Sequence, residues 1–99
     1  MLITGGDGSS EENAIVIRNA KTTKDGVNTE YKVVAKHFGV EDIDWRPVEQ
    51  YSISSDDTKR YYDIIHIKNR DGEHYAIWFD ITSFYGKEML FTITTFGTI

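Results

Sequence analysis

The sequence predicts an α+β fold of two layers. One helix packs on a four- to five-stranded, mainly antiparallel sheet, in the order β-α-β-β-β-β. Residues 28–39 have the apolar spacing of an amphipathic helix, and several later segments alternate between apolar and polar residues like half-buried strands. The connections between those later strands are short, which favours antiparallel pairing. A sheet and a single helix bury their apolar sides against each other, which gives the two layers.

The chain of 99 residues is expected to form one domain, residues 1–99. Hydrophobic residues make up 39% and charged residues 27%, which is a globular composition. The net charge of -5 and the scattered Lys and Arg residues speak against a nucleic-acid partner, because phosphate backbones are bound by clustered cations. No apolar run is long enough to cross a membrane. The absence of Cys excludes disulfides and thiolate metal sites.

The first half of the chain is expected to contain an irregular arm, a strand and the helix. Residues 1–12 are rich in Gly, Ser and acidic residues and predict the arm, and residues 14–17 predict a buried strand. Asn28 or Thr29 is the expected N-cap, with Glu30 near the positive end of the helix dipole. Gly39 is expected to end the helix. The apolar stripe facing the sheet comprises Tyr31, Val34, Ala35 and Phe38.

The second half reads as four strands. Pro47 marks the start of a strand over residues 48–54, because proline is tolerated at a strand start or edge. Residues 60–69 and 73–82 form a hairpin, and residues 89–96 form a last strand.

The turn Asn69-Arg70-Asp71-Gly72 decides which side chains of the hairpin share a face. A three-residue loop with Gly72 in the left-handed conformation is favoured over a two-residue Asp71-Gly72 turn, because the latter would place Lys68 and His66 among apolar residues. The favoured register predicts a core face directed at the helix. Its members are Ile65, Ile67, Tyr75, Ile77, Phe79 and Ile81, with Asp63 as the one charged residue.

The opposite side of the hairpin, which we call the far face, is the predicted binding surface. An exposed aromatic patch on a sheet is a candidate contact for a protein or ligand. The alternative is that the sheet curls, or that the N-terminal arm or the last strand covers this face. The predicted binding residues are Tyr62, Ile64, His66, His74, Trp78 and Asp80.

No catalytic residue, cofactor or metal site is assigned. His66, His74 and Asp80 match no known zinc spacing, and Lys68 opposes His74 across the hairpin. Asp63 is expected to be solvated or to pair with Arg60 or Lys59; only a buried Asp63 with a raised pKa would be a catalytic candidate.

The sequence therefore favours a small non-enzymatic binding domain. It would contact a protein partner, or a second copy of itself as a homodimer, through the Trp78 region or a free strand edge. The alternative is a ligand-binding or hydrolase-like domain with a site built from Asp63, His66, His74 and Asp80. The cytoplasm is the default location because no signal peptide is recognisable, although a chain whose leader had been removed would look the same.

Overall fold

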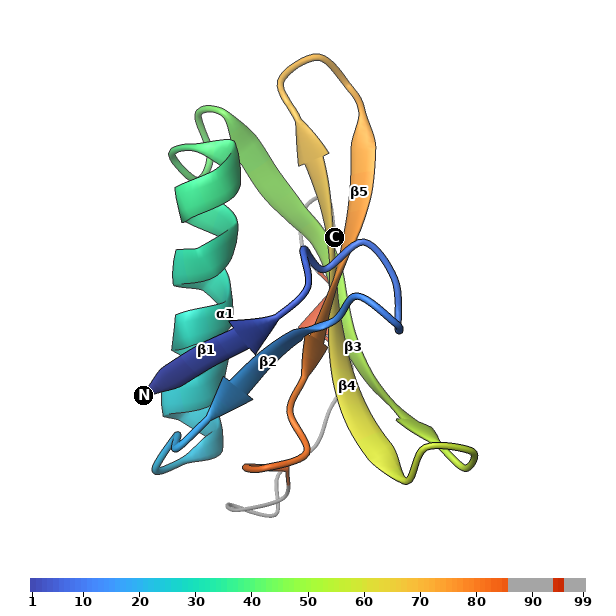
Figure 1. Ribbon diagram of the computed structural model, residues 1–99. Helices are drawn as coiled ribbons and strands as arrows, with labels where there is room; N and C mark the ends of the chain where they lie inside the picture. Colours follow the sequence, from blue (N-terminus) through green and yellow to red (C-terminus); the bar gives the residue numbers. More distant parts are fainter. Residues whose placement is uncertain (86–93, 96–99) are drawn as a thin grey trace.

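The computed structural model describes residues 1–85 and 94–95 of the chain. One helix lies against one side of a sheet, as Figure 1 shows, so the predicted two-layer α+β fold is confirmed. The elements are β1 (Leu2–Gly5), β2 (Ile15–Arg18), α1 (Thr23–Phe38), β3 (Trp45–Ser55), β4 (Arg60–Asn69), β5 (His74–Asp80) and β6 (Thr94–Thr95).

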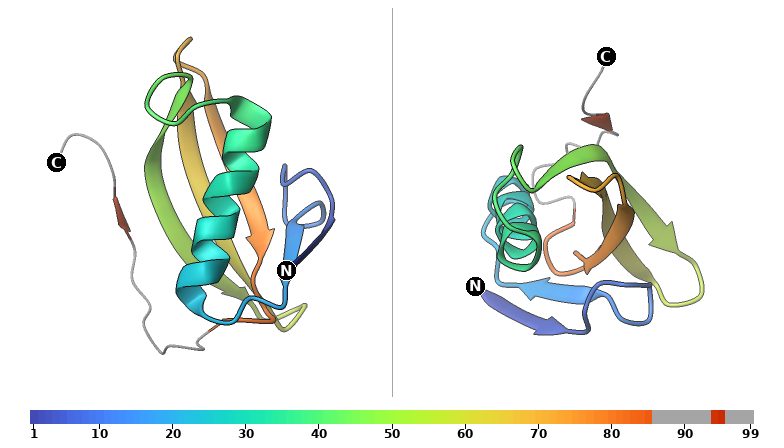
Figure 2. Two further views of the ribbon diagram at one scale, coloured as in Figure 1. Left: turned by 90° about the vertical axis from the view of Figure 1, so that its left-hand side faces the viewer. Right: turned by 90° about the horizontal axis from the view of Figure 1, so that it is seen from above.

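The strands form one sheet in the order β1-β2-β5-β4-β3-β6. All neighbours pair antiparallel except β2 and β5, which are parallel and meet only at Ile15–Phe79 and Val16–Asp80. Viewed from above, the strands curve around α1, with the β1–β2 hairpin on one side and β3 on the other (Figure 2). The short β2–β5 contact leaves most of β5 without a neighbour on that side among the described residues.

The β4–β5 hairpin has the predicted three-residue loop and register. Ile65 pairs with Ile77 and Ile67 with Tyr75, and Asn69 N–H donates to the Glu73 carbonyl at 2.9 Å. Gly72 has φ +84°, a conformation that glycine adopts without a steric cost. The Asn69 side-chain oxygen accepts hydrogen bonds from the backbone of residues 71 and 73, which closes the loop.

The helix begins earlier than predicted, so the expected N-cap at Asn28 or Thr29 is wrong. Thr22 is the N-cap, and its hydroxyl accepts a hydrogen bond from Asp25 N–H at 3.1 Å. Gly26, which reads as a helix breaker, is required inside the helix because a Cβ there would lie 2.3 Å from the ring of Phe84. The C-terminal end is as predicted, with Gly39 at φ 105° and its N–H bound to the Ala35 carbonyl.

The early start also changes which side of the helix is buried. Gly26, Glu30, Val33 and Val34 are buried against the sheet, while the predicted Tyr31, Ala35 and Phe38 are only partly buried. On the sheet, Ile65, Ile67, Ile77, Phe79 and Ile81 are buried in the core as predicted. Tyr75 is the exception, because it is 39% exposed at the end of the sheet.

The strands differ from the prediction mainly at the N-terminus and around Pro47. Within the expected irregular arm, Leu2–Gly5 forms β1, because it pairs along its whole length with β2. Strand β3 begins at Trp45 and continues through a buried Pro47, where a bulge between Pro47 and Glu49 accommodates the missing N–H. Of the predicted last strand, only Thr94 and Thr95 are described, and they pair with β3; the remainder lies outside the described residues. Within the described part of the chain, no helix has both the length and the apolar character needed to span a bilayer.

We expect Ile77→Ala to lower the free energy of unfolding by about 2–5 kcal/mol, because it removes three carbons from a side chain that is 6% exposed in the core. Chemical denaturation measures this change. Ala76→Ser, one residue away and exposed, is the matched control and should change the value by less than about 0.5 kcal/mol. Equal effects of the two substitutions would place Ile77 outside the core.

Candidate functional site

The predicted binding residues all lie on the far face, but most of them are not available for contact. Tyr62 and Ile64 are 3% and 2% exposed, and Asp80 is 5% exposed. Trp78 and His66 are partly buried, whereas His74 is exposed. The structure therefore confirms which face these residues share and corrects the expectation of an open aromatic patch.

Trp78 makes one contact through its side chain and one through its backbone. The ring of Tyr62 packs edge-on against the indole, with centroids 5.7 Å apart and planes at 72°. The backbone N–H of Trp78 donates to the Gly8 carbonyl at 2.8 Å, which fixes the N-terminal loop to the edge of β5. Residues 10–12 of the same loop border a cleft that Tyr62 and Asp80 also line, so the N-terminal segment adjoins this end of the far face.

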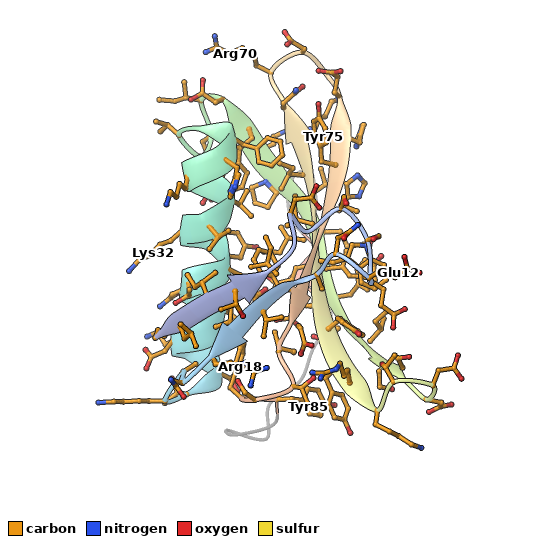
Figure 3. The ribbon with its side chains drawn as sticks, viewed as in Figure 1. Glu12, Arg18, Lys32, Arg70, Tyr75 and Tyr85 are labelled. Atoms are coloured by element: carbon orange, nitrogen blue, oxygen red, sulfur yellow. The ribbon has the colours of Figure 1, made fainter. Side chains whose placement is uncertain are left out.

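Asp80 lies at the floor of a cleft of about 730 Å³ between the N-terminal hairpin and the β3–β4 turn. Its carboxylate pairs with Arg60 at 3.0 Å and accepts hydrogen bonds from Thr82 N–H and Oγ. Glu12 lies in the N-terminal loop that borders this cleft (Figure 3). Since Asp80 is fully paired, it is poorly suited to act as a base.

Asp63 is on the opposite face from His66, His74 and Asp80, so the four residues of the alternative site are not brought together. It is 3% exposed and accepts a hydrogen bond from Ser52 Oγ, which replaces the expected solvation or pairing with Arg60 or Lys59. Arg60 is instead the partner of Asp80.

The position of Glu30 in the helix differs from the prediction. It was expected at the helix start but lies inside the helix, fully buried, with its carboxyl group close to that of Asp63. Burial, followed by the negative charge of Asp63, raises the pKa of Glu30 well above its usual value. The helical spacing of Gly26, Glu30, Val33 and Val34, which places them on one side of α1, was the sequence pattern that could have indicated the burial of Glu30. The carboxyl groups of Glu30 and Asp63 are both shielded from solvent.

An open strand edge and an adjoining cleft form a second candidate site in the described structure. Along β5, odd-numbered residues bond to β4, as Ile81 N–H does to the Tyr61 carbonyl at 2.9 Å. The backbone groups of His74 and Ala76 therefore point away from β4. Both residues are exposed, and β2 reaches β5 only beyond Trp78. Main-chain donors and acceptors of His74 and Ala76 are thus presented to solvent.

The cleft beside this edge has a volume of about 340 Å³ and separates β5 from the second half of α1. Tyr75, which Figure 3 shows near the hairpin end of the sheet, packs against Phe38 with ring centroids 5.1 Å apart. At the N-terminal loop, hydrogen bonds from Ser9 lower the pKa of Asp7, which keeps a negative charge beside the cleft. The lining residues are Asp7, Gly8, Ser9, Ile15, Val33, Val34, His37, Phe38, Tyr75, Ala76 and Ile77.

Comparison of this chain with protein-family models, curated proteins and solved structures gives no match. Function must therefore be argued from the site, because an α+β fold by itself serves many unrelated functions. The β5 edge and its cleft combine exposure with unused main-chain hydrogen-bonding groups.

We expect the free energy of unfolding to fall as pH rises from the usual pKa of glutamate to the raised pKa of buried Glu30. The folded state keeps a proton there that the unfolded chain releases, so stability is highest below the unfolded value. The slope is about 1.4 kcal/mol per pH unit for a single group. Glu30→Gln should remove this slope, while Glu12→Gln, at an exposed position, should preserve it. Denaturant titrations between pH 4.5 and 8 measure the difference; a slope that survives Glu30→Gln would contradict the assignment.

Proposed function

We propose that this protein is a non-enzymatic binding domain that captures an extended peptide segment of a partner protein along the free edge of β5. The observation that carries the proposal is that, among the described residues, no strand pairs with His74–Ile77 on the side of β5 away from β4, while an apolar cleft runs along the same edge. Addition of a strand to an exposed sheet edge is a recurring mode of peptide recognition. Main-chain hydrogen bonds supply affinity in this mode, and pockets for alternate side chains supply specificity.

The main chain of β5 offers the required groups. The N–H and C=O of Ala76 and His74 point outward, and Gly8 already uses the next outward N–H, that of Trp78. The N-terminal loop therefore already bonds to the Trp78 end of the edge, and a bound peptide would continue this hydrogen bonding towards His74. A peptide lying beside His74 and Ala76 would complete the hydrogen bonding of the strand.

The cleft offers a place for the peptide's side chains. Phe38 and Tyr75 form an aromatic contact at its hairpin end, and Val33, Val34 and Ile77 contribute apolar surface. Alternate residues of an extended peptide point to the same side, so every second side chain can enter the cleft. Asp7 and the net charge of -5 favour a segment that also carries Lys or Arg.

A partner's peptide suits this edge better than a second copy of the chain. In the part of the chain that the structure describes, the free edge of β5 spans four residues, His74–Ile77, so edge-to-edge pairing of two copies would bury little area for a stable dimer. Two copies would each bring the same negative charge to the contact. An extended peptide can place its side chains in the cleft between β5 and α1. Edge-to-edge pairing of two copies would leave that cleft unfilled.

Selection from a displayed library of random peptides tests this function. We expect enriched sequences with apolar residues at alternate positions. Ala76→Pro removes the outward N–H without touching the bonds to β4, because proline is tolerated on an edge strand. It should weaken the selected peptides at least tenfold, a loss of about 1.4 kcal/mol, as measured by fluorescence anisotropy.

Ala76→Ser keeps the N–H and is the matched control; it should bind within about twofold of the original protein. Denaturation curves of both variants verify that they fold. Failure to enrich any peptide, or equal binding by the proline variant, would refute the proposal. A dimer in size-exclusion chromatography that the proline variant converts to a monomer would identify a second copy as the occupant instead.

A further inference from the structure

His66 and His74 meet on the exposed part of the far face. They come from β4 and β5 and are diagonal neighbours, since His66 pairs with Ala76 and His74 with Lys68. His66 Nε2 lies 2.9 Å from His74 Nδ1, with ring centroids 5.0 Å apart and planes at 51°. Two strands that are bonded along their whole length hold the imidazoles, so their separation is set by the sheet rather than by a loop.

Two imidazole nitrogens at this separation can share a proton or a metal ion. Nitrogens that each lie about 2.05 Å from a metal, at a right angle, are about 2.9 Å apart; a tetrahedral angle requires about 3.3 Å. Right-angled coordination by nitrogen is typical of Cu²⁺ and Ni²⁺, and Cu²⁺ binds such ligands most strongly among the divalent metals of its row. The observed distance thus matches a bidentate copper site without movement of either strand.

We propose that His66 and His74 chelate one divalent transition-metal ion, with Cu²⁺ preferred over Zn²⁺ and water completing the coordination. Among the described residues, no group of three or more His, Cys, Asp or Glu side chains is placed to hold a metal, so the protein supplies two ligands as it stands. Glu49 is a candidate for a third ligand. It lies on β3 and pairs with His66 of β4, and directly opposed residues have Cβ atoms about 4.5–5.5 Å apart.

The charges around the pair set the expected strength of the site. Lys68 lies directly opposite His74 and opposes a bound cation, whereas Glu49 on the other side of His66 favours one. The third histidine of the chain, His37, is not part of the site. It lies on α1, on the other side of the sheet, and its Nδ1 is 2.9 Å from the Val33 carbonyl. This arrangement provides an internal control for every measurement.

Titration of the full-length protein with CuCl₂ or ZnCl₂, followed by calorimetry and NMR, tests the site. We expect one saturable Cu²⁺ site, weaker Zn²⁺ binding, and paramagnetic broadening centred on residues 66 and 74. His66→Asn and His74→Gln should each weaken Cu²⁺ binding at least tenfold, and His37→Gln should leave it within twofold. Lys68→Met should tighten binding several-fold, an effect that a purely structural hydrogen bond between the rings would not produce.

Two results would overturn the proposal: the absence of saturable Cu²⁺ binding up to 1 mM, or binding that persists in the double variant His66→Asn/His74→Gln. Far-ultraviolet circular dichroism of each variant separates loss of the site from loss of the fold. The metal site does not depend on peptide capture, because Ala76→Pro leaves both histidines in place and should still bind Cu²⁺.

Discussion

The reversal of the chain at Asn69–Gly72 is the constraint on which the remaining structure depends. Gly72 adopts a positive φ, and the Asn69 side chain accepts two backbone hydrogen bonds within the loop. Together they fix a three-residue loop, and that loop fixes the pairing of β4 with β5. A slip of one residue would turn Ile65 and Ile67 to the far face and Lys68 into the core, so the turn decides both the core and the candidate sites.

The second constraint is the brief contact between β2 and β5. These strands pair over only two residue pairs, Ile15–Phe79 and Val16–Asp80. Next to them, the loop carrying Gly8 adds one hydrogen bond, from the backbone N–H of Trp78. The first half of β5 therefore keeps a free edge among the described residues. The shortness of the β2–β5 contact thus exposes the main chain on which the proposed function rests.

Sequence predicted the features that local chemistry determines and missed those that depend on distant contacts. The hairpin register and its core face follow from turn residues and a period of two, so they were predictable. The helix start was not, because Gly26 disfavours a helix locally and is retained since Phe84 occupies the space of its Cβ. Strand β1 exists through its pairing with β2, which no local pattern indicates. For the same reason the far-face residues were correctly assigned to one face, while their burial was not foreseen.

Strand β5 carries the core contacts, the edge of the proposed peptide site and one histidine of the proposed metal site, and its pleat keeps these three apart. Its odd-numbered residues bond to β4 and direct Ile77 and Phe79 into the core, which stabilises the fold. Its even-numbered residues point their backbone groups outward, where a peptide can reach them. The side chains of those same residues, including His74, lie on the far face beside β4. Since the pleat separates these directions, a change at the Ala76 backbone need not disturb the core or the histidine pair, and each property can be altered alone.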